Sequence, residues 1–95
     1  MKKILLSGRD DLTRVTQIGW GTLLPTEKIP PHRHMDMDEF FFFIKGTGSM
    51  KVNGQDFILT EGVFISVPAI ALHELECTGE PLEFFYFGLQ IYKVH

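Results

Sequence analysis

Two histidines and a glutamate stand close together near the middle of the chain. His32 and His34 are two residues apart, and Glu39 follows five residues after the second histidine. In a strand, residues i and i+2 point to the same face, with Cα atoms about 6–7 Å apart. A short turn through residues 35–38 would bring Glu39 onto an adjacent strand, facing the same point. Imidazole nitrogens and a carboxylate oxygen are suitable ligands for a divalent transition metal.

A third imidazole lies in a distant part of the chain. His73 falls within residues 71–77, where strand alternation would place it on the same face as Ala71 and Leu75. The fourth histidine, His95, is the last residue, and we expect it to fray. Burying three imidazoles and a carboxylate without a cation would leave polar atoms unpaired, which is costly. We therefore favour a metal site over a metal-free barrel whose histidines bond to one another or to water at an open mouth.

The spacing of these groups resembles the two sequence motifs of the cupin superfamily. The first motif is matched by His32-x-His34-x4-Glu39-x6-Gly46. The second is matched by Gly62-x5-Pro68-x4-His73. The resemblance spans Thr26 to Cys77 and implies an all-β, single-domain, cupin-type jelly-roll β-barrel with one divalent transition metal (Zn, Mn, Fe or Ni) inside. The metal ligands that it implies are His32, His34, Glu39 and His73.

At three positions the chain departs from the cupin pattern. Thr26 stands where a glycine is expected six residues before the first histidine, and Ile70 replaces the glycine expected two residues after the proline. Cys77 replaces the closing asparagine. All three are turn or flanking positions, so every expected ligand keeps its usual identity.

Length and composition limit the possible classes of protein. Ninety-five residues correspond to one domain, residues 1–95, whose small core a bound metal or a partner subunit would help to stabilise. A net charge of −3 without a cluster of Lys or Arg argues against nucleic acid and anionic membranes as partners. One cysteine allows no internal disulfide and favours a reducing compartment. The apolar run at residues 4–6 is too short for a signal peptide, and we expect a soluble, cytoplasmic protein.

The remaining pattern is typical of an all-β domain. Short apolar and β-branched segments alternate with turn residues, and no window sustains the 3.6-residue period of a helix. The expected strands are residues 3–6, 14–24, 39–45, 49–52, 55–59, 63–67, 71–77 and 82–89. Asn53-Gly54 predicts a two-residue hairpin turn. We expect a loop over residues 25–31, because Pro30 and Pro31 cannot donate to a strand ladder.

The expected strand over residues 39–45 is apolar on both faces. One face carries Glu39, Phe41 and Phe43. The other carries Phe40, Phe42 and Ile44. Because such a strand is normally covered on both sides, the second face must pack on another sheet layer or on another subunit. We expect a homodimer with Phe40 and Phe42 as contacts, although intramolecular packing explains them equally well.

Other candidate site residues have simpler explanations. Asp36 and Asp38 flank Glu39 and could provide an acid/base group, although solvated loop aspartates are far commoner. By strand parity Arg33 points away from the metal, and Cys77 is better explained as a buried apolar residue than as a nucleophile. Five large side chains could line a pocket, although core packing is the simpler explanation for each. These are Trp20, Phe41, Phe43, Met50 and Tyr86.

Two functions of different classes fit these features. In the first, the metal is a Lewis acid that orients the oxygen atoms of a small polar molecule inside the barrel. The resemblance then offers oxygenase, isomerase or lyase chemistry, with no catalytic residue assigned beyond the ligands. In the second, the domain is a non-catalytic module that binds a small ligand or a metal for storage or sensing. The mostly apolar inward faces favour binding, or chemistry by the metal alone.

Overall fold

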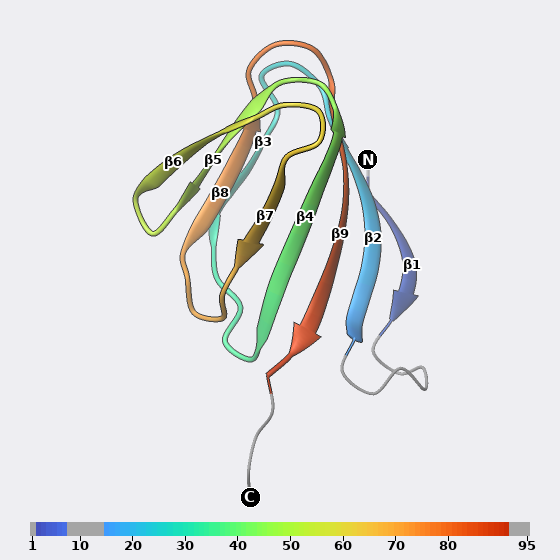
Figure 1. Cartoon of the computed structure of the whole chain (residues 1–95), viewed down its shortest axis with the longest axis vertical. Coiled ribbons are helices and arrows are strands. Elements are labelled where there is room, and N and C mark those ends of the chain that lie inside the picture. The colour runs from blue at the N-terminus through green and yellow to red at the C-terminus, as the bar shows by residue number, and fades with distance from the viewer. Residues whose placement is uncertain (1, 8–14, 92–95) are drawn as a thin grey trace, which may run out of the picture.

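The chain forms nine β-strands in the computed structural model, which describes residues 2–7 and 15–91 (Figure 1). These residues contain no helix, and hence no helix that could span a membrane. The strands are β1 (Lys2–Ser7), β2 (Val15–Leu23), β3 (Lys28–His32), β4 (Met37–Lys45), β5 (Gly48–Val52), β6 (Gln55–Leu59), β7 (Phe64–Val67), β8 (His73–Cys77) and β9 (Leu82–Gln90).

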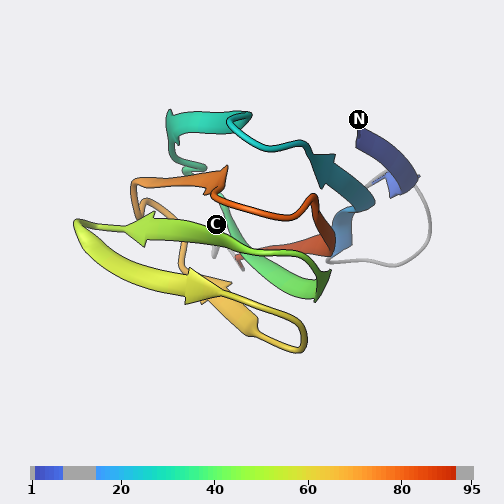
Figure 2. The ribbon, with the colours of Figure 1, turned by 90° about the horizontal axis from the view of Figure 1, so that it is seen from above.

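The strands are arranged in two antiparallel sheets. One sheet has the order β1-β2-β9-β4-β7 and the other has the order β3-β8-β5-β6. From β2 to β5, and again from β6 to β9, each strand lies in the sheet opposite to that of the strand before it. The smaller sheet occupies one side of the molecule in Figure 1, and Figure 2 shows the same strands from above. This is a jelly-roll arrangement, and it confirms the predicted all-β fold.

The inner faces of the two sheets carry apolar core at one end and polar side chains at the other. β4 has the buried Glu39 near its start and the fully buried Phe43 near its end. β8 starts at the buried His73 and ends at the buried Cys77. The other fully buried large apolar residues of the core are Met50, Leu59, Val67, Leu75 and Leu82. The polar ends of two strands from opposite sheets therefore meet above an apolar core.

The predicted hairpin at Asn53-Gly54 is confirmed. β5 and β6 pair in register from Gly48 with Leu59 to Val52 with Gln55. Asn53 has φ 48° and Gly54 has φ 83°, which is the backbone that a type I′ turn requires.

The loop expected over residues 25–31 is wrong in its second half. β3 begins at Lys28 and includes Pro30 and Pro31. Two facts make this possible: β3 is an edge strand, and its register with β8 shifts between Ile29 and His32. At an edge with an irregular register, neither proline is required to donate a ladder hydrogen bond.

The outer face of the five-stranded sheet is aromatic. Register places one row of side chains across β7, β4, β9 and β2, namely Phe64, Phe42, Phe85 and Trp20. A second row contains Phe40, Phe87 and Ile18. The rings of Phe40 and Phe87 stack with centroids 5.0 Å apart. Phe42 is nevertheless 42% exposed and Phe64 is 55% exposed, so packing among the described residues leaves this face partly uncovered.

Two loop residues adopt a backbone conformation that favours glycine. Thr26 has φ 73° and Ile70 has φ 76°. These are the two positions at which the cupin pattern has glycine, so the chain keeps the left-handed backbone without the residue that adopts it freely. The strain is greatest for a β-branched side chain such as that of Ile70, which is 54% exposed and loses little packing when removed.

We predict that Ile70→Gly stabilises the protein by about 0.5–1 kcal/mol, because relief of left-handed strain exceeds the added entropy of glycine in the unfolded chain. Denaturant unfolding midpoints measure the effect. The matched control is Ala69→Gly in the same loop, because Ala69 is not among the residues with positive φ. This control should destabilise the protein, and a loss of stability in both variants would contradict the strain at Ile70.

Candidate metal centre

The four side chains of the candidate site come from both sheets. His32 is the last residue of β3 and His73 is the first residue of β8, both in the four-stranded sheet. Glu39 lies on β4 in the five-stranded sheet. The expectation that Glu39 would be on a strand adjacent to the histidines is therefore wrong, because the chain crosses to the opposite sheet between His34 and Met37. His34 itself lies beyond the end of β3, in the connecting loop.

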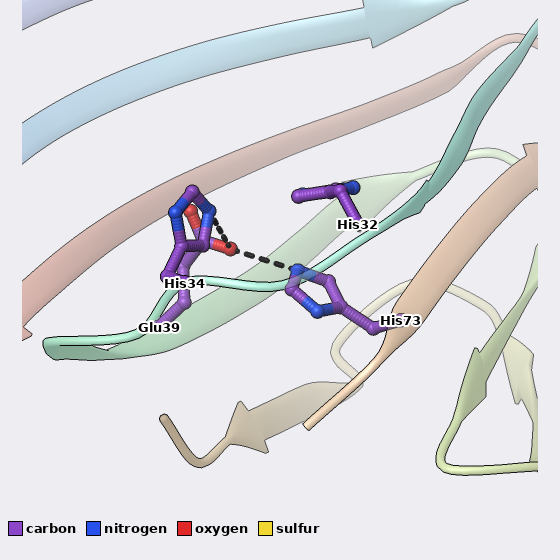
Figure 3. Close-up of side chains that lie close together, drawn as sticks. All are labelled: His32, His34, Glu39 and His73. Atoms are coloured by element: carbon purple, nitrogen blue, oxygen red, sulfur yellow. Dashed lines mark hydrogen bonds and ion pairs between the residues drawn. The ribbon is translucent and has the colours of Figure 1, made fainter. Parts of the chain in front are cut away.

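All four side chains point toward one another (Figure 3). One potential ligand atom from each lies within 4.8 Å of those of the other three. Glu39 Oε1 is 3.1 Å from His73 Nε2 and 3.5 Å from His34 Nε2. The ring centroid of His32 is 4.2 Å from that of His73 and 5.3 Å from that of His34. The structure thus brings together the four residues that the sequence motifs nominate.

Backbone carbonyl groups orient two of the imidazoles. The Nδ1–H of His32 donates to the carbonyl oxygen of Pro30 at 2.9 Å, and the Nδ1–H of His73 donates to that of Ala71 at 2.9 Å. A carbonyl oxygen only accepts, so both hydrogens are on Nδ1. In a neutral imidazole the lone pair is then on Nε2, the atom that His73 directs at Glu39. Such hydrogen bonds commonly fix the tautomer of metal-binding histidines.

The contact between His73 and Glu39 is buried. His73 is 1% exposed and Glu39 is 5% exposed. If His73 is neutral, an Nε2 lone pair faces a carboxylate oxygen at 3.1 Å, and these two acceptors repel unless a proton or a cation lies between them. Burial by itself lowers the pKa of His73, but the hydrogen bonds to Glu39 and Ala71 and the charge of Glu39 together raise the pKa above 6.5.

The loop that carries His34 is tied to the segment that precedes His73. The backbone N–H of Ile70 donates to the carbonyl oxygen of His34 at 2.7 Å, and that of Ala69 donates to Asp38 Oδ1 at 2.7 Å. Asp38 therefore has a structural contact outside the cavity described below. Asp36 and Arg33 are both exposed and do not line that cavity.

Comparison with known proteins decides the family. The family model for the cupin domain matches residues 19–88. The chain belongs to the cupin family. No curated protein sequence matches it significantly. Cupins commonly bind a transition metal, and this cupin has a cluster of the required side-chain types.

Several solved structures have the same fold as this cupin. A predicted oxalate decarboxylase from Thermotoga maritima is 23% identical, with a TM-score of 0.89 over 95% of this chain and 79% of that chain. A cupin protein from Bacteroides fragilis is 15% identical, with a TM-score of 0.83 over 100% of this chain and 80% of that chain. KdgF from Halomonas sp. is 16% identical, with a TM-score of 0.75 over 92% and 76%. At these identities the comparison concerns the fold alone.

A cavity of about 550 Å³ lies beside the four clustered residues. Its wall includes His32, His34 and Glu39, while His73 lies outside the wall. The purely apolar part of the wall is formed by Leu23, Ile29, Pro30, Phe41, Leu75 and Phe84. Gln17, Thr22 and Tyr86 add polar atoms. The wall of the cavity thus consists of candidate metal ligands on one side and mainly of hydrocarbon elsewhere.

Sequence reasoning identified only some of the cavity residues. Phe41 and Tyr86 line the cavity, whereas Phe43 and Met50 belong to the fully buried core and Trp20 lies on the outer aromatic face. Phe84 was missed, although it has the same strand parity as Tyr86 and could have been found from that signal. Leu75 was identified as sharing the face of His73, but its place in the cavity wall depends on how the sheets pack.

Two glycines in β2 create the space for the aromatic wall. A Cβ atom on Gly19 would overlap the ring of Tyr86, and a Cβ on Gly21 would overlap the ring of Phe84. Both glycines are buried on the inner face of β2. Their lack of a side chain therefore lets two rings from β9 lie directly against the backbone of the neighbouring strand.

In the metal-free protein, stability should fall as pH rises through the folded-state pKa of His73. A raised pKa means that the folded state holds this proton more tightly than the unfolded state, so the stabilisation is complete below about pH 6.5 and is lost above the raised value. Unfolding midpoints of metal-stripped protein across pH 5.5–8.5 measure this.

Glu39→Gln is the control for the origin of that pH dependence. The amide keeps the shape of the side chain and removes the charge that raises the pKa of His73, so this component of the pH profile should disappear. A profile that is unchanged in the variant would show that the dependence arises elsewhere.

Proposed function

We propose that this cupin binds one divalent transition metal through His32, His34, Glu39 and His73, and that a small molecule in the adjoining cavity coordinates the same ion. The contact of His73 Nε2 with Glu39 Oε1 supports this most directly, because a shared cation satisfies both acceptors at once. Three neutral imidazoles and one carboxylate are also an ordinary ligand set for Zn, Mn, Fe or Ni.

The four candidate ligands would have different roles because they differ in burial. His73 and Glu39 are buried and would hold the ion on its protein side, with the Glu39 carboxylate supplying the one negative charge. His32 and His34 are half-buried and border the cavity, so the open coordination positions would face the ligand. When bound, the metal supplies Lewis acidity toward the oxygen atoms of that ligand.

The metal site could serve either catalysis on the small molecule or binding of that molecule without reaction. Among the described residues of the cavity wall, Tyr86 is the only side chain with a titratable proton besides the candidate ligands. Proton transfer to a substrate would therefore depend on Tyr86, on a ligand side chain or on water. A wall this poor in acid/base groups favours capture of a ligand, or chemistry carried by the metal, over general acid–base catalysis.

The metal assignment predicts that purified protein holds about one ion per chain and that His34→Ala lowers the affinity by at least about 100-fold. Loss of even an outer partner of a metal ligand costs about 10–100-fold in affinity, and loss of a ligand should cost more. Elemental analysis and competition with a chromogenic chelator measure this. The matched control is Arg33→Ala, one residue away and outside the cavity, which should retain the ion. Equal metal content in both variants would contradict the assignment.

We also propose that two copies of this cupin pair through the outer aromatic face of the five-stranded sheet. Trp20, Phe42 and Phe64 alone leave roughly 300 Å² of aromatic surface exposed, taking about 200 Å² for a whole side chain. Their half-buried neighbours in the same rows extend this area toward the roughly 800 Å² per partner of a stable interface. On β7, β4, β9 and β2 these rows contain no charged residue, and the register continues the first row to Lys3 on β1. Two chains of net charge −3 therefore meet no carboxylate of their own within these rows.

Phe42→Asp should convert the dimer to a monomer, because the pairing would bury an unpaired charge in both copies. Light scattering coupled to size exclusion measures the mass. Ile58→Asp is the control, since Ile58 is 80% exposed on β6 of the other sheet, and it should leave the mass unchanged. A monomeric wild-type protein, or a dimer that survives Phe42→Asp, would remove this proposal.

A further inference from the structure

The described wall of the cavity contains almost no charged side chains. Among the described residues that line it, there is no lysine and no arginine. Its only carboxylate is Glu39, which belongs to the candidate metal site. Negative charge on the ligand must therefore be balanced by the metal alone, and Glu39 already offsets one of its two positive charges.

We infer that the ligand is a chelator with an apolar, ring-sized body and at most one negative charge. The inference rests on the proposed function, because it assumes an ion at the four clustered residues. A divalent ion, three neutral imidazoles and the Glu39 carboxylate together carry one positive charge. A monoanionic oxygen chelator makes the site neutral, whereas a dianion leaves one negative charge in an apolar cavity without a cation to pair with it.

The wall away from the candidate ligands specifies the rest of the molecule. Phe41, Phe84 and Leu75 line the cavity with rings and hydrocarbon, and Gly21 leaves room for the Phe84 ring close to the backbone of β2. Away from the candidate ligands the described wall has three polar side chains, Gln17, Thr22 and Tyr86, which are too few for the several hydroxyl groups of a sugar. A two-carbon acid would fill only a small part of the 550 Å³ and would leave the apolar wall in contact with water. A ring or branched hydrocarbon body removes that wall from water.

Three chelating probes separate these properties. Acetohydroxamate and benzohydroxamate are monoanions with the same O,O-chelating head and differ in the apolar body, while oxalate is a dianion with no body. Calorimetric titration of the zinc-loaded protein gives the affinities, each divided by the affinity of the probe for aqueous zinc, at concentrations that leave the zinc content of the protein unchanged.

We expect benzohydroxamate to bind at least about tenfold more tightly than acetohydroxamate, because its ring enters the apolar wall. Oxalate should bind more weakly than acetohydroxamate on the same scale. Equal affinity for the two hydroxamates, or tightest binding of oxalate, would overturn the inference.

A charge introduced into the wall provides a second test. Ile29 lines the cavity, is half-buried, and lies on β3 three residues before His32. Ile29→Arg should raise the relative affinity for oxalate by at least about tenfold, because the guanidinium pairs with the second carboxylate. The matched control Ile58→Arg, on the exposed face of β6, should leave it unchanged. An unchanged oxalate affinity in folded, zinc-loaded Ile29→Arg would contradict the charge argument.

Zinc content, measured before the titrations, separates the two levels of the proposal. A protein that takes up no zinc overturns the proposed metal site and this inference with it. A zinc-loaded protein that prefers oxalate, or that does not distinguish the two hydroxamates, overturns only the ligand class.

Discussion

A buried carboxylate that reaches from one sheet to the histidines of the other is the contact on which this structure depends. Glu39 and His73 are both almost inaccessible to water, and their nearest polar atoms are 3.1 Å apart. Each would be costly to bury alone, and together they require a proton or a cation between them. The two sheets are thus joined at this end by polar atoms and at the other end by a packed apolar core around Phe43 and Leu82.

Strand β4 contributes side chains to both faces of the five-stranded sheet. The inner side chains of β4 supply a candidate metal ligand, a cavity wall and a core residue, while the outer ones form part of the aromatic rows. Because strand side chains alternate, each face can carry a separate role without changing the other. The proposed metal centre and the proposed dimer surface therefore lie on opposite faces of one sheet, and a substitution on either face tests its own proposal.

The cavity owes its shape to small residues as much as to large ones. Gly19 and Gly21 accept the rings of Tyr86 and Phe84 against the backbone of β2, which leaves open space between those rings and the smaller sheet. The left-handed residues Thr26 and Ile70 lie in loops, Thr26 before the first motif histidine and Ile70 between Pro68 and His73 of the second motif. The hydrogen bond from Ile70 N–H to the His34 carbonyl helps to hold the Ile70 loop in this conformation despite the strain, since it joins the loop that carries His34 to the loop that leads into His73.

Local patterns in the sequence determined much of this description. Strand alternation placed Glu39 on one face with Phe41 and Phe43, and His73 on one face with Leu75, and Asn53-Gly54 predicted a hairpin. Resemblance to the cupin motifs nominated the four clustered residues. These features depend on neighbours in the chain, or on a spacing that the motifs record, so they could be predicted without coordinates.

Only the tertiary structure decided which sheet each strand joins. Alternation states which face a side chain occupies but is silent on its partner strand, so Glu39 was expected beside the histidines and is found across from them. Pro30 and Pro31 could enter β3 only because that strand is at an edge with an irregular register. The cavity wall likewise depends on the packing of β2 and β9 against the smaller sheet, a long-range arrangement that no local pattern encodes.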